Sequence, residues 1–369
     1  MGTRAAHGGR MDKRRRLVSQ REGIRIGVVG VGYWGSKHVR VLRSTTGVDS
    51  VVGIDERFSG SGGRHHHLDF DLAGYGNMEE ALPDVDALVI ATPPASHARL
   101  GMQAIAAGKH VLIEKPLATT TAEARLLVAA ADAAGLVLMP GHTLEHNAAV
   151  HKLRDLVRGH ELGQIFYLDC ARQNLGLFQP DVGVILDLAP HDISIANFVL
   201  GSQPSSVMAW GSRHVHAVYE DVAHLMLDYS DIGVRCNIHV SWLSPQKVRR
   251  VTAVGSRKMA VYDDLMADER IRVYDKSAVP PENCDGPLSR VAYHLGDMVS
   301  PFVPFAEPLA VQDQHFVDCI IDGSRPSTNG RSGLTVVQVL ECAQISITEQ
   351  RPVALAEVAG RQAAAGPVH

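Results

Sequence analysis

Short apolar runs rich in β-branched residues alternate with longer Ala- and Leu-rich stretches in the N-terminal part of the chain. The apolar runs predict strands over residues 24–29, 50–54, 87–91, 110–113 and 136–139. The stretches between them have helical periodicity and predict helices over residues 36–44, 78–82, 97–107 and 121–134. This alternation is typical of a parallel sheet covered by helices, so we predict a doubly wound nucleotide-binding domain over residues 23–141.

Beyond residue 141, apolar positions alternate with polar ones, as is typical of half-buried strands. After a helix over 147–158, this pattern predicts strands over residues 165–172, 206–210, 222–228, 234–240, 248–254 and 259–262. Gly-containing turns, such as the one at residues 229–233, predict antiparallel hairpins. Two final helices are predicted over residues 310–322 and 333–349.

These elements indicate a second, α+β domain over residues 142–369, with an open and mostly antiparallel sheet. A segment rich in Pro and Gly over residues 278–308 predicts a long irregular loop. Residues 1–22 include basic residues but no apolar stretch of the signal-peptide kind, so we expect a flexible tail. A chain of 369 residues is long enough to bury two cores, which agrees with this division.

Composition narrows the classes of function. A hydrophobic fraction of 45% and a charged fraction of 21% are ordinary for globular domains. The net charge of −4, without a patterned stripe of Lys and Arg in the predicted domains, argues against nucleic-acid binding. No run of about 18 apolar residues is present, so we expect no membrane span. The five Cys residues are scattered without a CxxC pair, which predicts a cytoplasmic protein without disulfides or a metal site.

A glycine fingerprint follows the first predicted strand directly, with Gly30, Gly32 and Gly35 around Tyr33 and Trp34. In a strand–turn–helix context, this GxGxxG pattern predicts a dinucleotide site that includes all five residues. Gly30 would form the tight turn, Gly32 would let the pyrophosphate approach the backbone, and Gly35 would let the helix pack closely on the strand. The N-terminus of that helix favours phosphate through its free N–H groups and its dipole.

The second predicted strand ends at Asp55, which lies 55 − 35 = 20 residues after Gly35. An acidic side chain there accepts hydrogen bonds from the adenosine ribose and repels the 2′-phosphate of NADP, so it favours NAD. Glu56 adds to the repulsion, whereas Arg57 would weaken it. An Asp at a strand end is also a common turn residue, and this alternative stays open here.

Further cofactor candidates follow the predicted strand over 87–91, because doubly wound folds bind ligands at the carboxyl edge of the sheet. Thr92 and Pro93 form a prolyl turn at this edge, and His97 follows them. We expect this turn to line the adenine or the nicotinamide side of the site.

The predicted strand over 110–113 ends in Glu114-Lys115-Pro116 at the same edge. Pro116 constrains Lys115 towards an extended conformation. Lys115 would then point to the place where nicotinamide and substrate meet. The alternative is an exposed Lys at a strand end, paired with Glu114.

Asp187 and His191 are four residues apart, and therefore share one face if their segment is helical. Oxidation of an alcohol needs a base that titrates near neutral pH, and His fits this requirement best. Asp187 could orient the imidazole and stabilise its protonated form, while Lys115 could stabilise negative charge on the substrate oxygen. In isolation, the pair would also fit a helix surface or a cap, but the fingerprint upstream favours catalysis.

Four motifs together, Gly30 to Gly35, Glu114-Lys115-Pro116, Gly141-His142-Thr143 and Asp187 with His191, resemble the glucose-fructose oxidoreductase and inositol dehydrogenase (Gfo/Idh/MocA) family. The resemblance covers nearly the whole chain from residue 23. It implies a Rossmann domain, a catalytic Lys at Lys115, catalytic roles for Asp187 and His191, and His142 in the cofactor site. It also implies oligomer contacts through the open sheet, in a homodimer or homotetramer.

Residues 174–179 and 186–192 are similar to enzymes that oxidise C3 of nucleotide-linked or amino sugars. We therefore expect an NAD-dependent oxidoreductase that converts a secondary sugar hydroxyl to a ketone. A ketosugar reductase running in reverse, or a noncatalytic NAD-binding sensor, are the alternatives. Besides Lys115, Asp187 and His191, the residues expected to contact substrate are Asn147, Arg172, Asn174, Tyr293 and His294. Weaker candidates are Trp242, Lys247, Asp297 and His315.

Overall fold

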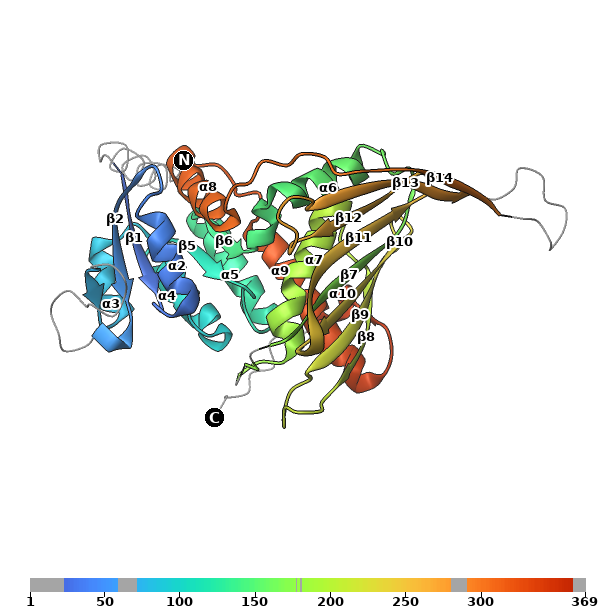
Figure 1. Ribbon diagram of the computed structural model, residues 1–369. Helices are drawn as coiled ribbons and strands as arrows, with labels where there is room; N and C mark the ends of the chain where they lie inside the picture. Colours follow the sequence, from blue (N-terminus) through green and yellow to red (C-terminus); the bar gives the residue numbers. More distant parts are fainter. Residues whose placement is uncertain (1–22, 59–71, 177, 180, 280–290, 361–369) are drawn as a thin grey trace, which may run out of the picture. The chain divides into compact units, whose positions relative to one another are not determined.

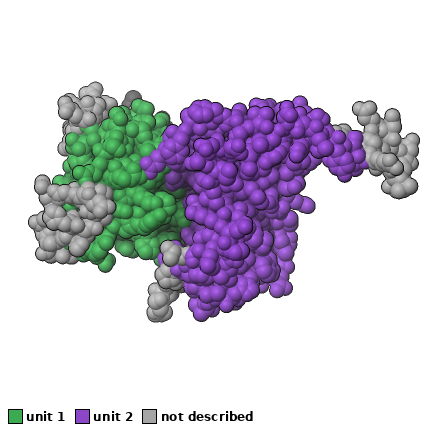
Figure 2. Space-filling view, viewed as in Figure 1, with its two compact units in different colours: residues 1–119, 123–141, 309–333 green, residues 120–122, 142–308, 334–369 purple. Residues whose placement is uncertain are grey.

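The computed structural model describes residues 23–58, 72–176, 178–179, 181–279 and 291–360 (Figure 1). The predicted tail over residues 1–22 lies outside these ranges. The chain forms two compact units, coloured separately in Figure 2. Unit 1 consists of Met1–Thr119, Glu123–Gly141 and Leu309–Gly333. Unit 2 consists of Thr120–Ala122, His142–Pro308 and Leu334–His369.

Unit 1 contains a six-stranded parallel sheet in the order β3-β2-β1-β4-β5-β6. Its strands are β1 (Ile24–Val29), β2 (Val48–Ile54), β3 (Gly74–Tyr75), β4 (Ala87–Ile90), β5 (His110–Glu114) and β6 (Leu138–Gly141). Its helices are α2 (Tyr33–Leu42), α3 (Met78–Ala81), α4 (His97–Ala106), α5 (Thr121–Ala134) and α8 (Pro308–Asp322). The predicted doubly wound sheet is confirmed. The strand order reverses between β1 and β4, where such folds bind ligands.

Helix α8 belongs to unit 1, although it follows unit 2 in sequence. Its residues Phe316, Val317 and Cys319 are buried in one cluster with Ile26 and Val39 of the parallel sheet and α2. We predicted this helix but assigned it to the domain over 142–369. Its apolar face explains the observed grouping, because it fills the core of unit 1.

Unit 2 contains a nine-stranded sheet in the order β14-β13-β12-β11-β7-β10-β9-β8-β15. Its strands are β7 (Ile165–Leu175), β8 (Ser206–Ser212), β9 (Val222–Tyr229), β10 (Val234–Ser241), β11 (Leu243–Gly255), β12 (Met259–Asp263), β13 (Ile271–Val279), β14 (Ala292–Val299) and β15 (Val353–Ala354). Only β7 and β10 pair in parallel among the described strands of this sheet, so the mostly antiparallel prediction is confirmed. Helices of this unit are α6 (Ala148–Arg158), α7 (Val184–Leu200), α10 (Leu355–Gly360) and most of α9 (Gly330–Glu349).

The prediction of an irregular loop over 278–308 is wrong for β14. This strand pairs with β13 in an antiparallel hairpin at the edge of the sheet. All eight of its residues are exposed, including Tyr293 and Leu295. Because β14 has no buried face, its sequence does not alternate between apolar and polar residues. Such alternation is the signal that predicts strands, so this strand is not predicted.

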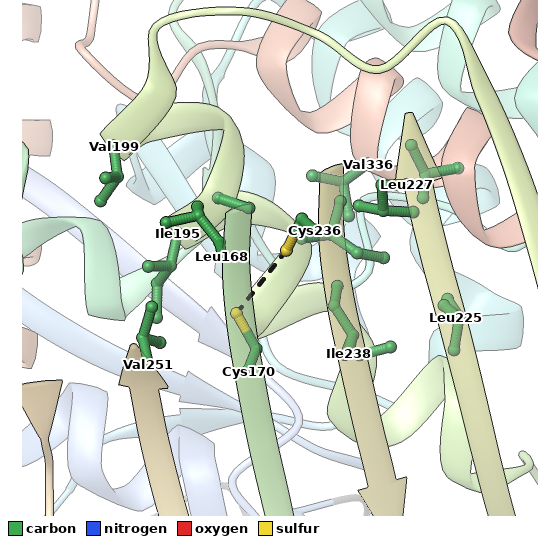
Figure 3. Close-up of a cluster of buried hydrophobic side chains, with 14 of the residues drawn as sticks. Leu168, Cys170, Ile195, Val199, Leu225, Leu227, Cys236, Ile238, Val251 and Val336 are labelled. Atoms are coloured by element: carbon green, nitrogen blue, oxygen red, sulfur yellow. Dashed lines mark hydrogen bonds between the residues drawn. The ribbon is translucent and has the colours of Figure 1, made fainter. Parts of the chain in front are cut away.

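The core of unit 2 lies between one face of its sheet and the helices α6, α7 and α9. Figure 3 shows part of it, where Ile195 and Val199 of α7 pack near Leu168 of β7. The thiols of Cys170 and Cys236 lie 3.8 Å apart in this cluster. The neighbouring thiol and burial raise the pKa of Cys170 well above its usual value. Both groups therefore behave as packed apolar side chains.

The helices of the described chain lack a segment that is both long enough and apolar enough to span a bilayer.

Candidate active site

The loop between β1 and α2 has the geometry expected of a phosphate-binding turn. Gly30 has φ of +81°, and a Cβ on Gly35 would collide with the Gly30 carbonyl oxygen. A Cβ on Gly32 would meet no described atom within 4 Å, and no described side chain caps α2 at this residue. The loop thus leaves open space beside uncapped helical N–H groups, which fits the pyrophosphate of a dinucleotide.

Two aromatic residues at the start of α2 are exposed beside this loop. Tyr33 and Trp34 are in edge-to-face contact, with ring centroids 5.6 Å apart. The Nζ atom of Lys37 lies 4.0 Å from the Tyr33 centroid and 4.6 Å from the Trp34 centroid. A cation over two rings holds these side chains in place at the edge where a ligand would bind.

Asp55 at the end of β2 is bound on both carboxylate oxygens. Its Oδ2 accepts a 2.9 Å hydrogen bond from the Val31 amide, and Arg57 donates bonds of 2.7 Å and 2.9 Å to Oδ1 and Oδ2. The Arg57 guanidinium is the main cause that lowers the pKa of Asp55 to about 2. Asp55 is therefore ionised at neutral pH, and its charge is partly balanced by Arg57. Glu56 is exposed beside them.

His97, the first residue of α4, connects two turns at the carboxyl edge of the sheet. Its Nε2 lies 2.8 Å from the Thr92 carbonyl oxygen, and its Nδ1 lies 2.8 Å from that of Pro116. Burial lowers the pKa of the ring, and a neutral ring donates to one of the two carbonyls at a time. Pro93 follows Thr92 in the first of these turns, and its carbonyl oxygen accepts a hydrogen bond from Ser96 Oγ.

Glu114, at the end of β5, binds a buried histidine that the sequence did not point to. His38 Nε2 lies 3.1 Å from Glu114 Oε1, and His38 Nδ1 lies 2.9 Å from Asp313 Oδ2. Burial lowers the pKa of His38, but the two carboxylates outweigh this effect and raise it to about 10. His38 is therefore an imidazolium that donates to both carboxylates.

Lys115 follows directly and is half-buried at the carboxyl edge of the parallel sheet. Its backbone N–H donates a 3.0 Å bond to Glu114 Oε2, and its peptide bond to Pro116 is cis. The Glu114 carboxylate is thus shared by His38 and the Lys115 backbone.

His142 follows β6 and is buried, yet neither of its ring nitrogens has a hydrogen-bond partner among the described residues. Nδ1 lies 3.2 Å from Glu145 Oε1, but outside hydrogen-bonding geometry. Unpaired nitrogens of this kind are costly to bury. A polar ligand at the end of β6 would pair them.

Asp187 and His191 lie one turn apart on α7, a helix that was not among the predicted elements, so they share one helix face. Both are half-buried. The buried Trp242, between β10 and β11, donates a 3.2 Å bond from Nε1 to Asp187 Oδ2. Trp242 also packs on Phe178, with ring centroids 5.2 Å apart. The Asp187 carboxylate is thereby anchored to the core of unit 2.

The next residue of α7, Asp192, is fully buried and binds Arg172 of β7. Arg172 donates bonds of 2.8 Å and 3.0 Å to the two carboxylate oxygens. The structure thus gives Arg172 a partner inside unit 2. This ion pair fixes the register of α7 on the sheet next to His191, and sequence reasoning passed over Asp192.

The remaining substrate candidates are dispersed through unit 2. Asn147 caps α6 by accepting from the Ala149 amide at 2.9 Å, and it donates to the Tyr262 hydroxyl. Asn174 is half-buried on β7. Tyr293 and His294 lie exposed on β14, and His294 pairs with Asp275.

Three strands separate β14 from β7, which at about 4.8 Å per strand places them about 19 Å apart across the sheet. The structure therefore does not bring Tyr293 and His294 close to Asn174 in this unit. Among the weaker candidates, Lys247 and Asp297 are exposed on β11 and β14, and His315 of α8 accepts from the Ser327 amide.

Two structurally important residues, His38 and Asp313, carried no signal in the sequence. Trp242 was a weak candidate, but its bond to Asp187 was not predicted. His38 and Asp313 are 275 residues apart. A single sequence offers no periodicity that links such positions.

Comparison with known proteins finds two family models that match this chain. One, described as oxidoreductase family, NAD-binding Rossmann fold, matches residues 24–142. The other, the GFO/IDH/MocA C-terminal domain, matches residues 150–261.

Individual relatives and structures agree with these models. A UDP-N-acetylglucosamine 3-dehydrogenase from Acidithiobacillus ferrooxidans is 29% identical over 69% of this chain and 78% of its own length. A 1,5-anhydro-D-fructose reductase from Ensifer adhaerens is 40% identical, but over only 34% of this chain and 41% of its own length. A solved structure of GenD2 from gentamicin A biosynthesis, in complex with NAD, has a TM-score of 0.72 at 24% identity, covering 96% of this chain and 99% of that chain. The last comparison shows a shared fold.

The buried His38 predicts a pH dependence of stability. Its pKa is about 10 in the folded protein and about 6.5 when unfolded. The folded state holds the proton to higher pH, so this contribution is complete below about pH 6.5 and is lost as the pH rises towards 10. The free energy of unfolding, measured in urea over this range, should fall more steeply for wild type than for His38→Gln. Parallel slopes would contradict the assignment.

Proposed function

The chain belongs to the Gfo/Idh/MocA family of NAD-binding oxidoreductases, and we propose that it oxidises a secondary hydroxyl, at C3, of a nucleotide sugar or amino sugar to a ketone. The observation that carries this proposal is the pair on α7. Asp187 and His191 share one helix face, and the Asp187 carboxylate is anchored by Trp242. A positioned carboxylate beside an imidazole is the arrangement that a general base needs.

The cofactor would be held by the residues at the carboxyl edge of the unit 1 sheet. The loop from Gly30 to Gly35 fits the pyrophosphate, Asp55 the adenosine ribose, and His142 a polar group at the end of β6. NAD bound by these residues would supply the acceptor for the hydride that leaves the substrate carbon. Thr92 and Pro93 would line the same edge, whereas His97, which is 1% exposed, would act on it only through its contact with the Thr92 carbonyl.

Each catalytic residue has a distinct role in this proposal. The neutral His191 imidazole takes the proton of the substrate hydroxyl. Asp187 stabilises the imidazolium that forms, and its bond to Trp242 keeps the carboxylate in place. The Lys115 ammonium donates a hydrogen bond to the substrate oxygen and stabilises the negative charge that develops there.

Support for C3 oxidation comes from the relative named as a UDP-N-acetylglucosamine 3-dehydrogenase, which matches over most of its length. The match to a 1,5-anhydro-D-fructose reductase favours a second candidate, reduction of a ketosugar by the same residues. In that direction, protonated His191 would supply the proton to the oxygen. Assays with NAD and sugar, and with NADH and ketosugar, separate the two.

Assembly through the open face of the unit 2 sheet is part of the proposal, in a homodimer or homotetramer. This face has a hollow of about 470 Å³ lined by residues of β7, β8, β9, β10 and β11. Trp210 is 57% exposed there, Met226 is 39% exposed, and His224 stacks on His239 at 3.9 Å. Exposed apolar groups concentrated on a sheet face are typical of an interface. We place the enzyme in the cytoplasm, where its buried thiols stay reduced.

The chemical step gives the most direct test. His191→Ala should lower kcat by about 100- to 10,000-fold, the usual effect of losing a general base, with NAD affinity near wild type. Lys115→Met should also lower kcat severely. In wild type, kcat/KM for oxidation should rise with pH along a limb that disappears in His191→Ala. If both variants kept the wild-type rate, other residues would perform the proton transfer. A wild type without turnover in either direction would make a noncatalytic sensor the better interpretation.

Cofactor choice should depend on Asp55. We expect NAD to be preferred over NADP by at least about tenfold in kcat/KM, roughly 1.4 kcal/mol. Asp55→Ser should reduce this preference, because Arg57 loses its carboxylate partner and becomes available to the 2′-phosphate. Adding Arg57→Ala should then weaken the use of NADP. An unchanged ratio in Asp55→Ser would show that Asp55 does not face the ribose.

Trp210→Arg should shift the protein towards monomer, as measured by light scattering after size exclusion, because it places a charge in the proposed interface. Leu126→Arg is the matched control, since Leu126 is 59% exposed on α5 in unit 1. It should leave the oligomeric state unchanged. A monomeric wild type, or equal behaviour of the two variants, would contradict assembly through this face.

A further inference from the structure

The two residues that flank Lys115 are each held by a different buried histidine. Glu114 precedes Lys115 and is bound through its side chain by His38. Pro116 follows Lys115 and is bound through its backbone carbonyl by His97. Both histidines are at most 1% exposed, so neither ring can contact a substrate that enters from solvent.

His38 contacts two carboxylates, those of Asp313 and Glu114. Asp313 of α8 holds His38 from one side by bonds of 2.9 Å and 3.1 Å, and Glu114 holds it from the other. The second oxygen of Glu114 accepts the Lys115 N–H at 3.0 Å. The position of the Lys115 backbone nitrogen is therefore tied to a chain of buried charged groups.

The His97 side fixes the other end of the same residue. Its ring lies between the carbonyl oxygens of Pro116 and Thr92, at 2.8 Å from each. Packed between both carbonyls and donating to one of them at a time, the ring connects the segment after Lys115 to the turn after β4. The ring is 1% exposed, so it has little freedom to release these contacts.

We propose that His38 and His97 are positioning residues that act through Lys115, one from each side of it. This inference rests on the proposed function, in which the Lys115 ammonium contacts the reacting oxygen. A Lys side chain has four rotatable bonds, so its ammonium reaches a defined place only if its backbone is fixed. A displacement of about 1 Å in a reacting group can cost about 100-fold in rate.

The test is a set of double-mutant cycles. His38→Gln and His97→Gln should each lower kcat by about 10-fold or more, with the Kd for NAD and the KM for the sugar within about threefold of wild type. In the Lys115→Met background, the same substitutions should produce almost no further loss in kcat, because their effect passes through the missing ammonium. A merely structural role would lower kcat by a similar factor in both backgrounds.

His110→Gln is the matched control. His110 lies at the opposite end of the same strand, β5, where its Nδ1 accepts a 3.0 Å bond from the Val137 amide. This variant should leave kcat near wild type in both backgrounds. If His38→Gln fails to fold, Asp313→Asn tests the same set of contacts, because it weakens the hold of Asp313 on His38. His97→Gln tests the contact with Pro116 independently.

The outcomes separate this inference from the proposed function. If Lys115→Met itself retains wild-type kcat, the assigned role of Lys115 is wrong. If Lys115→Met is impaired but the His38 and His97 variants behave like His110→Gln, the proposed function stands and the positioning role is overturned. Additive losses in the double variants would overturn it equally.

Discussion

A buried imidazolium between two carboxylates connects the parts of unit 1 on which the candidate cofactor site depends. His38 lies on α2, the helix that begins at the glycine loop, Glu114 ends β5, and Asp313 lies on α8. The imidazolium is the counter-charge of both buried carboxylates, so removing it leaves them uncompensated at a cost of about 3–5 kcal/mol. The start of α2 and the end of β5 therefore hold their relative positions as one assembly.

The parts of the site that could be predicted from sequence are those that depend on local backbone chemistry. Gly30, Gly32 and Gly35 follow from the turn, the open approach and the close packing that a strand–loop–helix junction requires. The four-residue spacing of Asp187 and His191 is likewise local, although the helix α7 that gives it a shared face was not predicted. Each of these features needs only a few neighbouring residues, so the pattern alone contains the information.

The features that were missed depend on long-range partners or on exposure. Asp187 is anchored by Trp242, 55 residues further along the chain, and Arg172 binds Asp192 across a helix–sheet contact. The strand β14 has no buried face, so no apolar alternation marks it. The periodicity of apolar residues shows that a segment has a buried face, but not what that face packs against. It therefore does not reveal which side chains form pairs. It also does not reveal strands that pair through their backbones alone.

The return of α8 to unit 1 also has a consequence for how the protein is made. Segments up to Gly141 supply the whole parallel sheet. The segment Leu309–Gly333 is made later, and it supplies Asp313, which pairs with His38, and Phe316 and Val317, which complete the core. A ribosome adding about 5–20 residues per second needs about 10–40 s to extend the chain from residue 141 to residue 333. During this interval the nascent nucleotide-binding unit exposes an unfilled apolar surface, and His38 has Glu114 as a partner but lacks Asp313. This is the period in which a chaperone would have the most to bind.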